Sequence, residues 1–357
     1  MQELINTLTE LIKCRASNRE GANAAIDYCA ARLKKSGVSV NIHENAGYRM
    51  LTAGRGKGTG KTVILHGHVD VIPGEEMQFI PRIEGERLYG RGSYDMLGAV
   101  AVMLHLMERF VQYRQHPDVL LMLVPDEEVG SNFGTPFLIE QGYTGGFVIS
   151  GEPTNLDISL QAKGVLHLEA EVKGVSAHGS RPWLGENAIE KAMSIYLSIK
   201  ELPFNRVSND YFPAPSLNLA TINGGKVFNQ VPDSCSFGLD IRYLPGQNPE
   251  EIIEEIKRVS EDMNLKRVQY FSPVSVDRQH PFVQALFHAV AKFSRDGARF
   301  FGQDGSGDTR FFTPLGIPAV EFGPCGAGHH GKEEFVVLPS LLEYEKILLQ
   351  FFNDYLS

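Results

Sequence analysis

The order of apolar and polar residues changes once along the chain, and its first part is typical of alternating strands and helices. Short apolar runs such as "TVILHGHVD", "VLLMLVP" and "GFVIS" are separated by stretches with helical periodicity such as "MLGAVAVMLHLMERF". Strands that alternate with helices form a mostly parallel sheet that is covered by helices on both faces. The first 163 residues therefore predict an α/β fold of this kind.

From residue 164 the pattern is typical of a sheet with one solvent-exposed face. In "GVLHLEAEVKG" apolar and polar residues alternate strictly, as in a strand that covers a core on one side only. A helix over about 186–202, two strands, a helix with Asn248 as its N-cap and a last strand follow. This order, β-α-β-β-α-β, predicts a ferredoxin-like α+β unit. The α/β pattern then resumes, so we predict one domain formed by residues 1–163 and 277–357, with an inserted domain at 164–276.

Composition and charge restrict the kinds of partner. The chain has 357 residues, more than one compact core of average size would hold. Its net charge of −9 and the lack of a basic tract argue against nucleic acid and against an anionic membrane surface. We see neither a signal peptide nor an apolar stretch long enough to cross a bilayer, and the four scattered cysteines suit reduced thiols. We expect a cytoplasmic protein.

Four separate apolar runs end in side chains that commonly bind metals. These side chains are His68 with Asp70, Glu127 with Glu128, Glu152, and the pair His329 and His330. A further acid, Asp95, lies in the glycine-rich loop "YGRGSYDMLG" before a helix. Ligands of open α/β sheets bind beyond the carboxyl ends of the strands, so we expect these groups to meet at one rim. Carboxylates packed so densely repel one another unless cations neutralise them, and two divalent ions would do so.

The residue types indicate which ions and which chemistry. A mixed set of imidazoles and carboxylates suits Zn²⁺, with Co²⁺ or Mn²⁺ as possible substitutes. Asp70 follows His68 by two residues and is placed to accept the second imidazole N–H, which would fix the ring orientation. Of the adjacent Glu127 and Glu128, one would bind metal and the other would transfer protons. Taken singly, each group has an ordinary alternative: acids at a helix N-terminus, a core histidine, or an aspartate that shapes a turn.

Six motifs in one order resemble a known family of co-catalytic zinc hydrolases. They are "GHVDVIP", "GRGSYDMLG", "PDEEVGS", "SGEPT", "VSAHGS" and "GHHGKEEF". The family includes succinyl-diaminopimelate desuccinylase, acetylornithine deacetylase, aminoacylases and glutamate carboxypeptidases, and the resemblance covers essentially the whole chain. It implies a zinc-peptidase-like fold with these metal ligands: His68 and Glu152 on one zinc, Glu128 and His330 on the other, and Asp95 bridging the two.

The same resemblance implies roles for residues beyond the metal ligands. Glu127 becomes the general base, and His178, reached across a dimer interface, would stabilise the oxyanion. Four residues match positions near the substrate: Arg242, Asn229, and in the loop "GSGDTRFF" Asp308 and Arg310. Two plain alternatives stay open: an ion pair with Asp240 for Arg242, and an ordinary loop histidine for His178. Many relatives have lysine where this chain has Leu97, which we expect to lie on the apolar face of the following helix.

We therefore predict a homodimeric di-zinc amidohydrolase that cleaves the amide bond of a small N-acylated amino acid. It should be most similar to the desuccinylase or the acetylornithine deacetylase. An aminopeptidase, dipeptidase or carboxypeptidase of the same family, acting on a dipeptide, is the first alternative. A metal-stabilised binding protein without turnover is the second, and an intact base at Glu127 argues against it.

Overall fold

The computed structural model describes residues 1–54, 57–113, 117–294 and 297–356. They form two compact units. Unit 1 contains residues 1–160, 276–301 and 307–357, and unit 2 contains residues 161–275 and 302–306. Within the described residues, no helix is long and apolar enough to cross a membrane.

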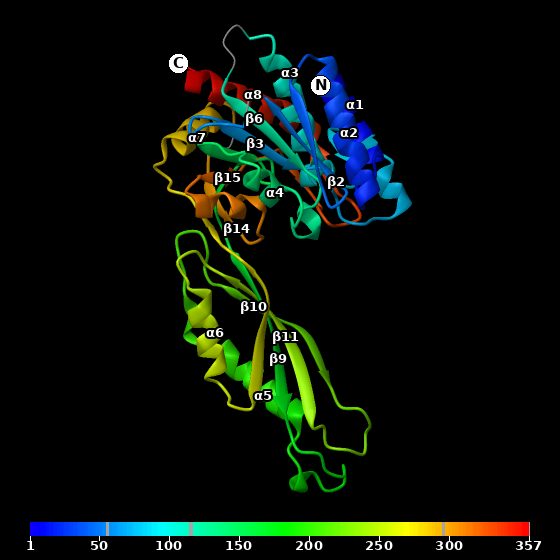
Figure 1. Ribbon diagram of the computed structural model, residues 1–357, viewed down its shortest axis with the longest axis vertical. Coiled ribbons are helices and arrows are strands. Elements are labelled where there is room, and N and C mark those ends of the chain that lie inside the picture. Colours follow the sequence, from blue (N-terminus) through cyan, green and yellow to red (C-terminus); the bar gives the residue numbers. More distant parts are fainter. Residues whose placement is uncertain (55–56, 114–116, 295–296, 357) are drawn as a thin grey trace. The chain divides into compact units, whose positions relative to one another are not determined.

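The main sheet has a parallel centre and antiparallel flanks (Figure 1). Its order is β1 (Val40–Asn45), β2 (Tyr48–Gly54), β6 (Val119–Val124), β3 (Val63–His68), β7 (Phe147–Ser150), β15 (Ala319–Glu321), β8 (Ile158–Ala162) and β13 (Val274–Ser275), with β14 (Phe300–Gln303) paired to β8. The pairs β6–β3, β3–β7 and β7–β15 are parallel, and the pairs β1–β2, β2–β6, β15–β8 and β8–β13 are antiparallel. This confirms the predicted α/β class. Every residue of β3 and of β6 is buried, which explains why both strands are continuously apolar apart from the histidines of β3.

Helices cover both faces of this sheet. They are α1 (Gln2–Lys13), α2 (Arg19–Lys35), α3 (Gly98–Phe110), α4 (Thr135–Glu140), α7 (Pro281–Phe293) and α8 (Leu338–Leu356). Successive strand residues point to opposite faces, and β3 shows both packings. Ile64 belongs to a core cluster with Leu138 of α4. On the other face Gly67 meets α3, where an added Cβ would lie 3.1 Å from Val100. A smaller sheet joins β16 (Gly326–Ala327), β17 (Phe335–Val337), β5 (Arg87–Tyr89) and β4 (Arg82–Glu84).

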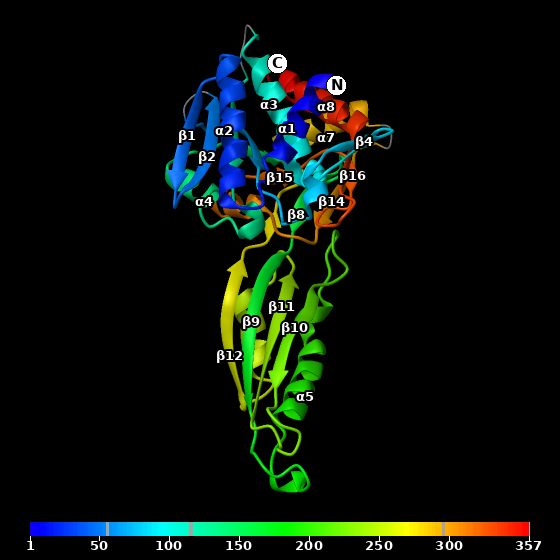
Figure 2. The same ribbon diagram turned by 90° about the vertical axis from the view of Figure 1, so that its right-hand side faces the viewer.

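Unit 2 is an antiparallel sheet (Figure 2), and two helices pack on one of its faces. The sheet order is β10 (Ser216–Gly224), β11 (Ser234–Tyr243), β9 (Gly164–Lys173) and β12 (Met263–Phe271), and the helices are α5 (Ala188–Lys200) and α6 (Pro249–Lys257). Alternate residues of β9 and β11 pack against both helices in one core cluster. Asn248 caps α6 as expected, because its side chain accepts a hydrogen bond from the Glu250 N–H at 3.0 Å. Along the chain these elements follow the split βαβ order.

Candidate active site

Five predicted metal ligands of unit 1 come from segments that are far apart in the sequence. His68 is the last residue of β3, Glu152 lies two residues beyond β7, and Glu128 lies four residues beyond β6. Because β6, β3 and β7 are parallel neighbours, their carboxyl ends meet at one edge of the sheet. Asp95 precedes α3, and His330 lies in the loop between β16 and β17. The sheet topology therefore brings three of the side chains to one rim, and two loops add the others.

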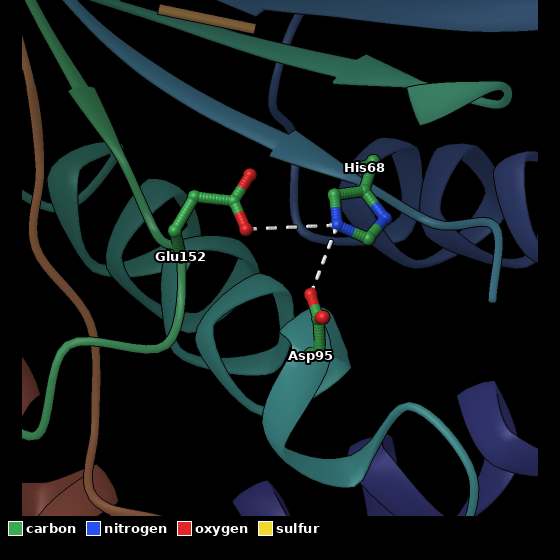
Figure 3. A group of neighbouring side chains, drawn as sticks. All are labelled: His68, Asp95 and Glu152. Carbon is green, nitrogen blue, oxygen red and sulfur yellow. Dashed lines mark ion pairs between the residues drawn. The ribbon is translucent and has the colours of Figure 1, made fainter. Parts of the chain in front are cut away.

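His68, Asp95 and Glu152 form a first group of possible ligands (Figure 3). The His68 Nε2 atom lies 3.3 Å from Asp95 Oδ1 and 3.8 Å from Glu152 Oε2. This nitrogen is buried and has no hydrogen-bond partner. A buried imidazole nitrogen that faces two carboxylates without a good hydrogen bond is the arrangement that a shared cation would satisfy.

Asp95, Glu128 and His330 form a second group. The His330 Nε2 atom lies 3.1 Å from Glu128 Oε2 and 3.3 Å from Asp95 Oδ2. Asp95 therefore belongs to both groups and turns one carboxylate oxygen to each. Nitrogen and carboxylate donors of this kind suit divalent transition metals, so the residues fit a two-metal centre with one bridging carboxylate.

The charges of this cluster show how strongly it attracts positive charge. Burial alone would raise the pKa of Asp95, but contacts with His330 and His68 hold that pKa below its usual value. Conversely, the carboxylates of Asp95 and Glu128 raise the pKa of His330 to about 10. Burial opposes the charged form of His68, yet its acidic neighbours raise its pKa well above the usual value. Cations, whether protons or metal ions, are thus stabilised here.

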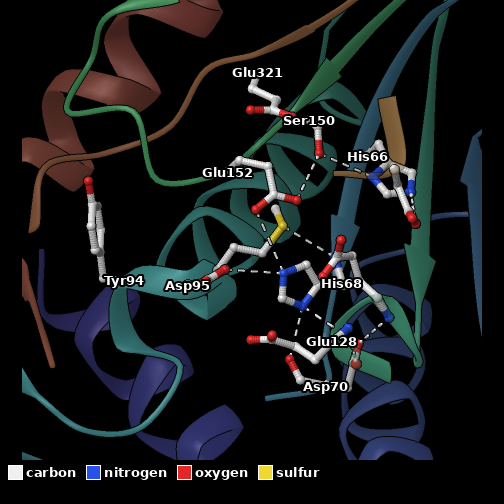
Figure 4. Close-up of polar contacts among 12 residues, drawn as sticks. His66, His68, Asp70, Tyr94, Asp95, Glu128, Ser150, Glu152 and Glu321 are labelled. Carbon is white, nitrogen blue, oxygen red and sulfur yellow. Dashed lines mark hydrogen bonds and ion pairs between the residues drawn. The ribbon is translucent and has the colours of Figure 1, made fainter. Parts of the chain in front are cut away.

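Asp70 positions the glutamates more directly than it positions His68 (Figure 4). The carboxylate oxygens of Asp70 accept hydrogen bonds from the backbone N–H groups of Glu127, at 3.1 Å, and Glu128, at 2.9 Å. The His68 Nδ1 atom lies 2.9 Å from the backbone oxygen of Asp70 and 3.6 Å from its carboxylate. The spacing from His68 to Asp70 therefore orients the imidazole mainly through a main-chain oxygen, while the carboxylate holds the loop after β6.

Glu127 opens the short 3₁₀ turn η3 (Glu127–Val129) beside the first group. Burial raises the pKa of Glu127 well above its usual value; the positive charge of His68 opposes this, and nearby Glu152 and Asp308 add to it. The Arg310 guanidinium lies 3.9 Å from the Glu127 carboxylate and also lowers its pKa. A carboxyl group with a raised pKa can exchange a proton near neutral pH.

Asp308 and Arg310 lie in η6 (Asp308–Phe311), inside unit 1. The Asp308 carboxylate is fully buried and accepts hydrogen bonds from Ser131 and, at 2.5 Å, from Thr135. It also lies 3.4 Å from His66 Nε2, and Arg310 donates to the Ser131 hydroxyl at 3.0 Å. These contacts hold the Asp308 carboxylate inside unit 1, and its contact with substrate stays a prediction.

Two polar residues of this region escaped the sequence analysis. His66 lies on the same face of β3 as His68, and its Nδ1 atom is 3.2 Å from the Ser150 hydroxyl. The Ser150 hydroxyl is in turn 3.5 Å from Glu152 (Figure 4). The i, i+2 spacing of the two histidines is the sequence signal that would have placed His66 beside the candidate ligands.

The predicted residues of unit 2 lie apart from the metal ligands in the sequence and belong to another compact unit. His178 is exposed, and its Nδ1 atom lies 2.8 Å from the Ser180 hydroxyl. The backbone oxygen of Asn229 accepts a hydrogen bond from the Gly179 N–H at 2.8 Å, so the loops of His178 and Asn229 are neighbours. Arg242 forms the ion pair with Asp240 that the sequence left open, at 2.8 Å. In unit 1, Leu97 is buried as expected.

Comparisons with known proteins identify relatives of this chain in sequence and in fold. The model of peptidase family M20/M25/M40 matches residues 64–354. The chain is 29% identical to a succinyl-diaminopimelate desuccinylase of Colwellia psychrerythraea over 297 residues, 76% of this chain and 74% of the relative. It is 28% identical to an acetylornithine deacetylase of Myxococcus xanthus over 363 residues, 96% and 94% of the two chains. The crystal structure of the aminopeptidase PepT from Bacillus cereus has the same fold, with a TM-score of 0.85, 17% identity and coverage of 100% and 99%.

Proposed function

This chain belongs to peptidase family M20/M25/M40, and from that premise we propose that it is a di-zinc amidohydrolase of small N-acylated amino acids. The family match confirms the predicted resemblance and the predicted class of enzyme, a hydrolase of amide bonds. The observation that supports the two-metal proposal most strongly is Asp95, whose two carboxylate oxygens face two separate sets of nitrogen and oxygen donors.

In this proposal His68 and Glu152 would hold one zinc, Glu128 and His330 would hold the other, and Asp95 would serve both. When bound, the metal pair would polarise the scissile carbonyl and supply a nucleophilic water near neutral pH. The chain positions the ligands at the carboxyl edge of the sheet, and the backbone oxygen of Asp70 holds His68 in one tautomer.

Glu127 is the proposed general base and acid. It would take a proton from the attacking water and deliver it to the leaving amine, and its burial supports a pKa suited to both steps. Arg310, 3.9 Å away, would keep the Glu127 carboxylate oriented, and Asp308 would support Arg310 through Ser131. Both residues remain candidates for binding the substrate, as the family resemblance implies.

The remaining roles belong to unit 2. His178 would donate a hydrogen bond to the oxyanion, and Arg242 and Asn229 would bind the carboxylate and the acyl portion of the substrate. Exposure of His178 and Asn229 supports contact with a ligand or a second subunit, and a homodimer is part of the proposal. The four free cysteines support a reducing compartment, the cytoplasm.

The alternative is a peptidase of the same family that recognises a free α-amine. The full-length fold likeness to an aminopeptidase accommodates it, and the two deacylases among the sequence relatives favour the first proposal. A hydrolysis panel with added Zn²⁺ separates the two, using N-succinyl and N-acetyl amino acids against dipeptides with a free amine. Faster turnover of the dipeptides would overturn the deacylase proposal.

The Glu127→Gln variant separates an enzyme from a binding protein that holds metals without turnover. We expect loss of hydrolysis by roughly 10²-fold to 10⁴-fold, the usual contribution of general acid–base catalysis, with both metals retained. Unchanged turnover in this variant would remove Glu127 as the base.

A further inference from the structure

Glu334 is a buried carboxylate that so far has no part in the proposed reaction. It directly precedes β17 and is 2% exposed. Its oxygens accept four hydrogen bonds, all from one short segment of the chain. The donors are Arg91 Nη1 at 2.8 Å, and the backbone N–H groups of Gly92 at 2.9 Å, Tyr94 at 3.1 Å and Asp95 at 3.1 Å.

The four donors divide evenly between the two oxygens of Glu334. Oε2 accepts from Arg91 and Gly92, and Oε1 accepts from Tyr94 and Asp95. A buried carboxylate is costly unless it is hydrogen-bonded and paired, and here the guanidinium of Arg91, itself 4% exposed, provides the pairing charge. The segment from residue 91 to residue 95 is therefore wrapped around one side chain.

This contact joins the two loops that complete the metal centre. Asp95 ends the segment that Glu334 holds, and its side chain is shared by both groups of candidate ligands. His330 lies four residues before Glu334 in a loop that is exposed. The same loop is also tied by the Gln78 side chain, which donates to the Gly331 oxygen at 3.0 Å. A single buried carboxylate thus links the loop of Asp95 to the loop of His330.

We propose that Glu334 is a positioning residue of the metal centre, which sets where the Asp95 carboxylate stands relative to His68 and His330. The inference rests on the proposed two-metal function. It predicts that a change at Glu334 weakens metal binding although Glu334 touches neither metal. An outer residue that orients a ligand typically contributes 10-fold to 100-fold to metal affinity, so about that loss is expected.

Glu334→Gln tests the proposal. The amide can present its oxygen to only one pair of donors, and its NH₂ group then faces the other pair. Glu345→Gln is the matched control, because Glu345 is also a buried carboxylate of unit 1, 5% exposed, and pairs with Arg109 at 2.7 Å and His105 at 3.1 Å. Both variants lose a buried ion pair, and only the first one alters the segment that carries Asp95.

The experiment titrates the metal-free proteins with Zn²⁺ by calorimetry and records the visible spectrum after loading with Co²⁺. We expect Glu334→Gln to bind at least one ion about 10-fold to 100-fold more weakly and to show a shifted Co²⁺ spectrum, while Glu345→Gln matches the wild type. If Glu334→Gln does not fold, Glu334→Asp keeps the charge, withdraws the carboxylate by one methylene and should show the same shift.

The outcomes separate this inference from the proposed function. Wild-type affinity at both sites and an unchanged Co²⁺ spectrum in the Glu334 variants would overturn the inference, and the two-metal function would stand. Equal losses in Glu334→Gln and Glu345→Gln would also overturn it, because a general loss of stability would then explain both. A wild-type protein that binds fewer than two ions would overturn the two-metal function itself.

Discussion

Replacing Asp70 by asparagine would test whether its carboxylate mainly holds the loop of Glu127 or mainly orients His68. In the structure the carboxylate accepts two backbone N–H groups, at 3.1 Å and 2.9 Å, whereas the His68 ring is bonded to the backbone oxygen of residue 70 at 2.9 Å. The asparagine side chain has one acceptor oxygen, so one of the two N–H groups would face an NH₂ group. The contact of His68 with the main chain does not depend on the side chain.

The size of the effect follows from the lost hydrogen bond. A hydrogen bond to a charged group contributes roughly 1.5–3 kcal/mol, and Asp70 is only 5% exposed, so little solvent replaces it. If the loss displaces Glu127 in the transition state, it corresponds to a decrease in kcat of about 10-fold to 150-fold. If it displaces Glu128 instead, the metal site of Glu128 weakens by a similar factor.

Steady-state kinetics at saturating zinc, combined with zinc titration of the metal-free protein, measures both effects. We expect Asp70→Asn to lower kcat or to lower the zinc affinity of the site that contains Glu128. The zinc affinity of the site of His68 and Glu152 should stay within about twofold of the wild-type value, well below the tenfold change that about 1.4 kcal/mol would cause. A selective loss at the His68 site with full kcat would refute this reasoning. It would show that the carboxylate of Asp70 acts chiefly on the imidazole.

Three further predictions concern metal removal, pH and unit 2. Chelation should abolish hydrolysis and lower Tm, and zinc at 100 times its Kd should restore about 2.7 kcal/mol of stability. Thermal unfolding with and without zinc measures this effect, and an unchanged Tm would contradict a metal site in the folded state. Burial raises the pKa of Asp126 to about 6, so the folded state binds the carboxyl proton of Asp126 more tightly than the unfolded state does. The contribution of Asp126 to stability therefore falls as pH rises from about 4 through about 6. Relative to the wild type, metal-free Asp126→Asn should therefore gain about 1 kcal/mol in denaturant unfolding between pH 5 and pH 8, and a constant difference would contradict the raised pKa. Finally, His178→Ala should lower kcat about 100-fold to 1,000-fold without a change in Tm, because the side chain is exposed, and equal kcat would remove the oxyanion role.

The strands that carry the first ligands could be predicted because their burial is visible in the sequence. The run from Val119 to Val124 is apolar without interruption, which only a strand covered on both faces requires. Acids directly after such a strand are conspicuous, so position indicated Glu127 and Glu128 as candidates, while the family resemblance suggested their separate roles. The last strand predicted for the inserted domain corresponds to the run "RVQYFSPVSV", which in the structure divides into β12 and β13 around Ser272 and Pro273, because proline cannot donate a hydrogen bond within a sheet.

Other features were invisible because they depend on contacts between distant segments. Nothing near Asp308 in the sequence shows that its carboxylate is buried against Ser131, 177 residues earlier. Likewise, the partners of Glu334 lie about 240 residues before it, so its four hydrogen bonds could not be inferred from local pattern. Side-chain roles of this kind are decided by which loops pack together.

The sequence by itself determined the alternation of strands and helices, the change of pattern at residue 164, and the set of side chains able to bind metal, because periodicity and residue type are local properties. Only the tertiary structure decided that Asp70 holds the glutamate loop with its carboxylate and that Glu334 holds the segment of Asp95. The physical reason is that hydrogen bonds and charge pairs act over about 3 Å, so they depend on the folded path of the chain and not on separation along it.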